Sequence, residues 1–177
     1  MRKIFLLLAF ICFIVANAQD YKIEGNEIIF SKIIENTGKS VSEMHTSLEA
    51  FFALRYNNVN STNMLNQEDH LIYKGLFADI HTFPLGWIID VPHTLDISIK
   101  ENRLRIKVII SEGSCHNSSN ANSYTYLITN HSPIGNRNTK LLKVDAIKAF
   151  ETTCTRVNAL FLDIENSLAN NMVEDDW

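Results

Sequence analysis

The stretch His93–Ile110, HTLDISIKENRLRIKVII, contains the clearest local pattern in the chain and decides the class of fold. Apolar and polar residues alternate on both sides of Glu101-Asn102, which is the period of a half-buried strand. Asn tolerates the left-handed conformation of a two-residue turn, so the stretch predicts an antiparallel hairpin. One face of this hairpin is expected to lie on the core, with the side chains of Leu95, Ile97, Ile99, Leu104, Ile106, Val108 and Ile110.

The other face of the predicted hairpin is polar and contains a basic strip. The expected register places Asp96 opposite Lys107 and Ser98 opposite Arg105. Such a strip suits either a solvated strand face that discourages edge-to-edge pairing or a site for an anionic ligand. Both interpretations stay open for the candidate binding residues Lys100, Arg103, Arg105 and Lys107.

Further strands are predicted on either side of the hairpin. Residues 26–34, 71–80 and 124–129 are rich in β-branched and aromatic side chains, and a short strand through residues 64–65 would add one more. Gly75 indicates a bulge or a close backbone approach. Residues 113–123 are small and polar and predict a loop.

A second predicted loop carries another candidate binding residue. Pro84, Gly86 and Pro92 bracket the apolar run from Trp87 to Ile89. Proline and glycine interrupt regular structure, so this run predicts a loop with an exposed apolar patch around Trp87.

Two helices complete the predicted elements. Ser40 and Glu43 have the spacing of a capping box, and apolar residues then recur every three to four positions to about Arg55. The last helix could seed a coiled coil, but packing across a sheet suits its short stripe better. That stripe consists of Ile147, Phe150, Cys154, Val157, Phe161, Ile164 and Leu168.

These elements predict an α+β fold in the order β-α-β-β-β-β-α. The expected sheet is antiparallel, with four to five strands and two helices packed on one face. Residues 19–177 are long enough for a single domain with a substantial core. The acidic end before Trp177 is expected to fray.

Three segments carry a resemblance to a known family: NEIIFSKIIENTGKSVSEMHTSLEAFF (residues 26–52), LIYKGLF (71–77) and the hairpin. Together they resemble a family of unknown function, found in secreted proteins of Bacteroidetes, that has a TATA-binding-protein-like (TBP-like) fold. The resemblance covers about residues 23–110. It implies a fold and an exported location, and it transfers no activity or catalytic residues.

The first 18 residues have the pattern of a secretory signal peptide. Arg2 and Lys3 form a positive start, residues 4–15 are apolar, and small residues around Ala18 permit cleavage before Gln19. A spanning helix needs about 20 apolar residues, so a membrane anchor fits less well. The sequence therefore predicts an exported protein, periplasmic or secreted, with no membrane span after cleavage.

Charge argues against nucleic acid as a partner. The chain has 16 basic and 20 acidic residues. Cleavage of the signal peptide would remove Arg2 and Lys3, which leaves 14 basic against 20 acidic residues and a net charge of −6. Nonspecific binding to nucleic acid depends on neutralisation of phosphates by Lys and Arg. On this charge balance no nucleic-acid partner is expected. The TBP-like fold does not change that expectation, because a shared fold does not imply a shared function.

Cysteine usage is consistent with export. Cys12 leaves with the signal peptide, so Cys115 and Cys154 remain as an even pair. They form the disulfide candidate, and two unpaired thiols are the alternative.

No catalytic, metal or cofactor motif is present in the sequence, so we assign no catalytic residue, no metal and no cofactor. The histidines lack metal-ligand spacing. Neighbouring residues in Ser114-Cys115-His116 would point in different directions, with no third catalytic partner. An enzyme, metal-dependent or hydrolase-like, would have to use Asp79, His81, His93 and His116.

The favoured hypothesis is a noncatalytic exported protein, a binding or interaction module for an unknown protein or small ligand. Either the open face of the sheet or the Trp87 loop would supply its binding surface. The alternative is the metal-dependent or hydrolase-like envelope enzyme described above.

Overall fold

The computed structural model describes residues 21–55, 63–83, 86–117, 123–127 and 140–170. The predicted signal peptide and the acidic C-terminal end lie outside these residues. The elements follow the order β1 Tyr21–Glu24, β2 Glu27–Glu35, α2 Val41–Arg55, β3 Asn63–Gln67, β4 His70–Phe83, β5 Trp87–Lys100, β6 Arg103–Ile110, β7 Glu112–Asn117, β8 Ser123–Leu127 and α3 Lys140–Asn170.

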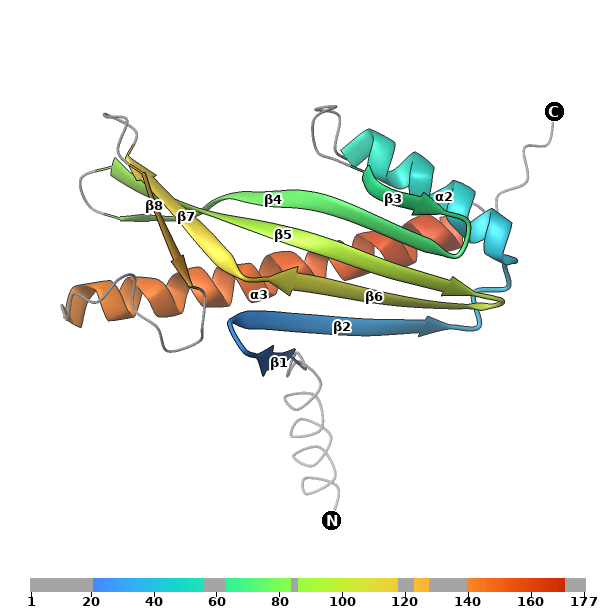
Figure 1. The fold of residues 1–177 in the computed structure, drawn as a ribbon, viewed down its shortest axis with the longest axis horizontal. Helices are drawn as coiled ribbons and strands as arrows, with labels where there is room; N and C mark the ends of the chain where they lie inside the picture. The colour runs from blue at the N-terminus through green and yellow to red at the C-terminus, as the bar shows by residue number, and fades with distance from the viewer. Residues whose placement is uncertain (1–20, 56–62, 84–85, 118–122, 128–139, 171–177) are drawn as a thin grey trace, which may run out of the picture.

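Within the described residues, the strands form one antiparallel sheet of eight strands rather than the predicted four to five. Strands β1-β2-β6-β5-β4-β3 are neighbours in that order, while β7 pairs with β5 and β8 pairs with β7 (Figure 1). The α+β class is confirmed, but the predicted element order is wrong. It omitted β1 before β2, and it assigned the residues of β7 to a loop.

The long strand β5 has two successive neighbours along one edge. Its residues 94–100 pair with β6, and its residues 87–90 pair with β7. Pro92 falls in the interval between the two, so its missing N–H interrupts no ladder hydrogen bond on that side. This position explains why a stretch with prolines continues as a strand.

The hairpin of β5 and β6 has the predicted register. Asp96 lies opposite Lys107 and Ser98 opposite Arg105. Asn102 turns the chain at φ 59°, in the left-handed region. Its side chain also accepts a hydrogen bond of 2.6 Å from the N–H of Gly38, which fixes the connection between β2 and α2 against this turn.

Helix α2 begins at the predicted capping box. The Ser40 hydroxyl accepts the Glu43 N–H at 3.3 Å, and the Glu43 carboxylate accepts the Ser40 N–H at 2.7 Å. The Ser40 hydroxyl also donates to the Glu43 carboxylate at 2.6 Å, and this bond, together with the one from the Ser40 N–H, lowers the pKa of Glu43. Two orphan backbone donors are thereby satisfied at the start of the helix.

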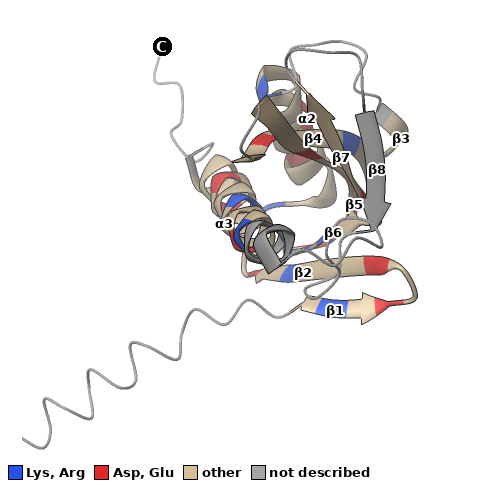
Figure 2. Ribbon diagram, turned by 90° about the vertical axis from the view of Figure 1, so that its left-hand side faces the viewer, with Lys and Arg blue, Asp and Glu red and all other residues tan. Residues whose placement is uncertain are grey.

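Both helices lie on the same side of the sheet, as predicted (Figure 2). The seven apolar side chains expected on the core face of the hairpin are each at most 3% exposed. From α3, Val157, Leu160 and Ile164 are fully buried against this face, and Phe52 of α2 stacks near Tyr73 of β4 with ring centroids 4.3 Å apart. We call this the covered face of the sheet.

Ion pairs join the helices to their surroundings. Lys32 of β2 contacts Glu165 of α3 at 2.5 Å, and Arg55 of α2 pairs with Asp163 of α3. At the edge strand β3, Asn66 accepts a hydrogen bond from His45 at 2.7 Å and donates one to Glu49 at 2.5 Å. Helix α2 and the C-terminal part of α3 are thus tied to the sheet and to each other.

The predicted bulge in β4 is displaced. Its register with β5 shifts between Phe77 and His81 rather than at Gly75. Asp79 adopts φ 53° there, and its N–H donates to the Asp90 carboxylate at 2.9 Å. The bulge therefore depends on a side-chain acceptor from the neighbouring strand, which the local sequence of β4 does not contain.

Candidate functional site

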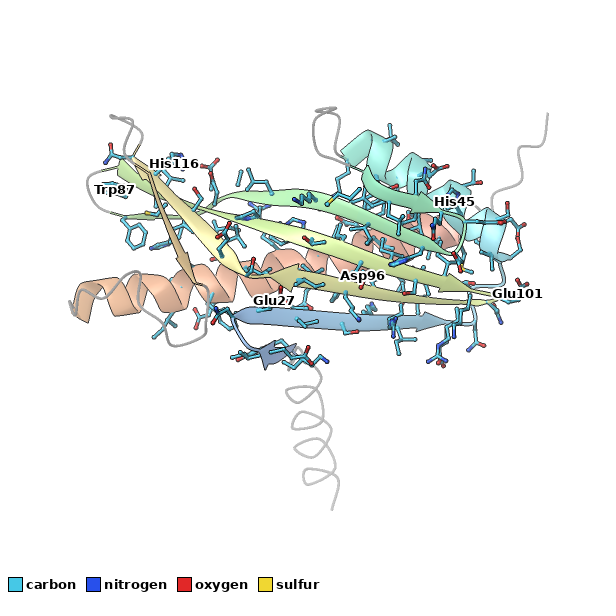
Figure 3. All side chains as sticks on the ribbon, in the orientation of Figure 1. Glu27, His45, Trp87, Asp96, Glu101 and His116 are labelled. Carbon is cyan, nitrogen blue, oxygen red and sulfur yellow. The ribbon has the colours of Figure 1, made fainter. Side chains whose placement is uncertain are left out.

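Opposite the two helices, the sheet presents side chains of β2, β6, β5 and β4 that we call the open face. Cross-strand partners arrange these side chains in rows. The rows are Glu35–Arg103–Lys100, Ile33–Arg105–Ser98–His70, Ser31–Lys107–Asp96–Ile72, Ile29–Ile109–Thr94–Lys74 and, beyond β6, Pro92–Leu76. Figure 3 places Asp96 midway along the sheet, between the Glu101 turn and the end with Trp87 and His116.

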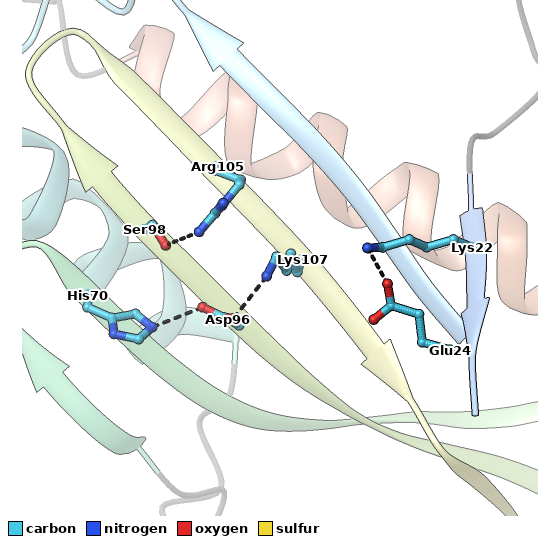
Figure 4. A network of polar contacts seen from close by, with 7 residues as sticks. All are labelled: Lys22, Glu24, His70, Asp96, Ser98, Arg105 and Lys107. Carbon is cyan, nitrogen blue, oxygen red and sulfur yellow. Dashed lines mark hydrogen bonds and ion pairs between the residues drawn. The ribbon is translucent and has the colours of Figure 1, made fainter. Parts of the chain in front are cut away.

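A half-buried carboxylate lies at the centre of the open face. Asp96 is 2.9 Å from His70 Nε2 through one oxygen and 3.7 Å from Lys107 Nζ through the other (Figure 4). The two contacts come from β4 and β6, on either side of β5. Asp96 therefore connects Lys107 of its own row with His70 of the neighbouring row, across three strands.

The four predicted basic residues lie together on the open face. Lys107 pairs with Asp96, and Arg103 pairs with Glu35 at 3.3 Å. Arg105 donates instead to a neutral acceptor, the Ser98 hydroxyl, at 3.1 Å. Sequence reasoning missed Lys74, which β4 adds to the same face across Thr94.

Exposed apolar side chains lie beside these cations. Ile33, the cross-strand partner of Arg105, is 47% exposed, and Leu76, two residues after Lys74, is 54% exposed. The open face thus combines positive charge with accessible apolar area, which is typical of surfaces that bind other molecules.

Trp87 does not lie in an exposed loop, so that prediction is wrong. It begins β5, in register with Phe83 on one side and Asn117 on the other. It is half-buried and packs against the core, and Ile89 beside it is fully buried. The apolar run from Trp87 to Ile89 belongs mainly to the structure of the sheet.

The predicted disulfide is absent, and Cys115 and Cys154 are free. Cys115 lies buried on β7, and Cys154 lies half-buried on α3. Burial raises the pKa of Cys115, as does the charge of Asp90, and burial raises that of Cys154 to about 11. An even count of cysteines carries no information about the distance between them, which is why the pairing could not be inferred.

The four residues of the enzyme hypothesis do not form one site. His93 is 4% exposed on the covered face and stacks on Phe77 with ring centroids 3.9 Å apart. His81 packs edge-to-face on Phe83, at 5.2 Å between centroids. Burial lowers the pKa of His93 to about 4, so this imidazole is neutral near pH 7.

The remaining two residues, His116 and Asp79, both contact the carboxylate of Asp90, a residue that the sequence analysis did not single out. His116 Nδ1 lies 3.3 Å from an oxygen of Asp90, whose other oxygen accepts the Asp79 N–H. Ser114, two residues before His116 on β7, is the cross-strand partner of Asp90. Adjacent residues of Ser114-Cys115-His116 point to opposite faces, as expected, but the segment is a strand rather than a loop, so Ser114 and His116 share a face. Between these described residues, however, no hydrogen bond joins Ser114 to His116.

Neither a metal cluster nor a spanning helix is found in the part of the chain that the structure describes. No group of three His, Cys, Asp or Glu residues there could hold a metal ion. No helix among those residues is long and apolar enough to cross a membrane.

Comparison with known proteins identifies similar folds. No family model and no curated protein matches the chain. A solved TBP-like protein from Parabacteroides distasonis ATCC 8503 has 18% sequence identity and a TM-score of 0.64, covering 84% of this chain and 97% of that one. A DUF4468 family protein from Bacteroides ovatus ATCC 8483 has 15% identity and a TM-score of 0.61, covering 84% and 90%. The expected resemblance to Bacteroidetes proteins of unknown function with a TBP-like fold is confirmed, and at these identities it concerns the fold alone.

Proposed function

We propose that this protein is a noncatalytic exported binding module that docks a partner on the open face. The observation that carries the proposal is the asymmetry of the sheet: two helices bury one face, while the other retains exposed Ile33 and Leu76 among charged residues. When a partner removes such apolar side chains from water, their burial contributes favourably to the free energy of binding. The arrangement needs no catalytic group.

A binding experiment compares two matched pairs of exposed apolar residues. Ile33→Asp with Leu76→Asp changes the open face, and Leu54→Asp with Leu162→Asp changes exposed positions on the helices. We expect components of an envelope extract retained by the wild-type protein to be lost with the first pair and kept with the second. Equal retention by both double variants would contradict docking on the open face.

Export is the second part of this proposal, and its support is the pattern of residues 1–18. Cleavage after Ala18 would release a protein that begins at Gln19. The measurement is the N-terminal sequence and mass of the protein recovered from periplasm and culture medium. Recovery only from the cytoplasm with Met1 retained would contradict export.

A hydrolase-like enzyme remains the second candidate because of the contact between Asp90 and His116. An acid-base pair beside Ser114 is part of what nucleophilic catalysis requires, although the nucleophile must also contact the base. The test is hydrolysis of a panel of p-nitrophenyl esters by the wild-type protein and by His116→Ala. Hydrolysis that His116→Ala abolishes would favour the enzyme, and its absence or persistence in that variant would count against it.

A further inference from the structure

The middle of the open face is more basic than the acidic chain around it. Its rows contain five Lys and Arg side chains and two carboxylates, those of Asp96 and Glu35. Two more carboxylates of the same face, those of Glu27 and Asp90, lie beyond these rows. The whole chain has a net charge of −4, so positive charge is gathered in these rows rather than over the whole face.

Three of these cations have no carboxylate to neutralise them. Among the residues that the structure describes, Asp96 pairs with Lys107 and Glu35 with Arg103, while no carboxylate lies within ion-pair distance of Arg105, Lys74 or Lys100. Lys74, Lys100 and Arg105 are also exposed. Their charges are available to a partner without the loss of an existing ion pair.

The apolar neighbours of these cations indicate what kind of partner fits. Arg105 lies beside Ile33, and Lys74 lies near Leu76, so two of the three available cations have an exposed apolar side chain next to them. A polysaccharide has no matching apolar side chains, and a lipid headgroup surface would not require this alternation. A protein surface with Asp or Glu next to Leu, Ile or Phe matches both properties.

Spacing sets the minimum size of such a partner. Arg105 and Lys74 are separated by two rows and two strands, which corresponds to roughly 17 Å in a regular sheet. An extended peptide covers that distance with about five residues.

We infer that the open face binds a protein segment in which acidic and apolar residues alternate or adjoin, with carboxylates at Arg105 and Lys74. This inference rests on the proposed binding function and specifies its partner. The charged contacts would select the segment and accelerate its association, while Ile33 and Leu76 would supply the area buried.

The test is selection of random 12-residue peptides on the purified wild-type protein, followed by affinity measurements. We expect selected peptides to be enriched in Asp and Glu next to apolar residues. Arg105→Glu with Lys74→Glu should weaken them by at least about tenfold. The matched control is Lys148→Glu with Arg156→Glu, which makes the same change of charge at exposed positions on α3 and should leave affinity within about twofold.

Other outcomes would overturn the inference. Selected peptides without acidic enrichment would do so, as would equal weakening by both double variants. Binding of anionic lipid vesicles or polygalacturonate without binding of acidic peptides would assign the face to another class of partner. If neutral peptides are selected and their binding is lost only in the Ile33→Asp, Leu76→Asp double variant, the proposed binding function stands and its acidic partner is refuted. If no selected peptide binds at the open face, both the binding function and the acidic partner are contradicted.

Discussion

The covered and open faces of the sheet are built by alternate residues of the same strands, yet they follow different rules. On β6, Leu104, Ile106 and Val108 are fully buried, while Arg105 between them is exposed. One backbone hydrogen-bond ladder serves both sets of side chains. Substitutions on the open face can therefore change surface chemistry with little effect on the packing that defines the fold.

The largest predicted difference between the faces is in stability. Truncation of Ile106 to Ala would leave a cavity beneath the helices, at a cost of about 3 kcal/mol in the free energy of unfolding. Lys107→Ala, the next residue but on the open face, should cost less than about 1 kcal/mol. Urea denaturation of both variants measures the difference. Equal losses would show that the two faces contribute alike.

A second contrast is between the folded protein and the protein unfolded in urea. It concerns the reactivity of the thiols that lie between the sheet and the helices. Cys154 has a pKa raised to about 11 from 9.0, mainly by burial. At pH 8 this lowers its thiolate fraction, and hence its reaction with Ellman's reagent, by about a hundredfold. In urea without reductant, Cys115 and Cys154 should each titrate promptly. Failure of both to react in urea would instead reveal the disulfide that the structure lacks.

A third contrast separates two histidines, His93 on the covered face and His70 on the open face. Because the pKa of His93 in the folded protein is about 4, below the usual 6.5, the unfolded chain binds the extra proton between these values. The stability contribution is complete above pH 6.5 and is lost as pH falls toward 4. Between pH 7 and pH 5 the loss is about 2 kcal/mol.

Two variants isolate this effect. His93→Phe should remove that part of the pH dependence of unfolding, and His70→Gln should retain it. Urea denaturation at pH 7 and pH 5 gives the comparison. An undiminished difference in His93→Phe would mean that other groups cause it.

The sequence was most informative where local pattern decides structure. The alternation around Asn102 predicted the hairpin and its register, and the pairing of Ser40 with Glu43 predicted the start of α2. These signals lie within a few residues of each other. Alternation also placed the four basic residues on one face before the strand order was known.

Elements held by distant partners could not be predicted in the same way. The residues of β7, EGSCHN, have little intrinsic preference for a strand, and they are ordered by pairing with β5 and β8. Likewise, Ile33 and Lys74 join the candidate site because β2 neighbours β6 and β4 neighbours β5. Asp90 could not be assigned to a site from the sequence either, because it contacts His116 only through the pairing of β5 with β7.

The smallest predicted effect concerns the polar contacts of Asp96, and it decides whether the open face is needed for folding. Asp96→Asn keeps the shape of the side chain and removes the charge that faces His70 and Lys107. Because these side chains are partly exposed, we expect a loss below about 1 kcal/mol, and less in 1 M salt, where charges on the surface are screened. A double-mutant cycle with Lys107→Ala measures the coupling. A coupling energy above about 2 kcal/mol would mean that the contact between Asp96 and Lys107 stabilises the fold. A small value would mean that these charged residues can contact a partner without loss of stability.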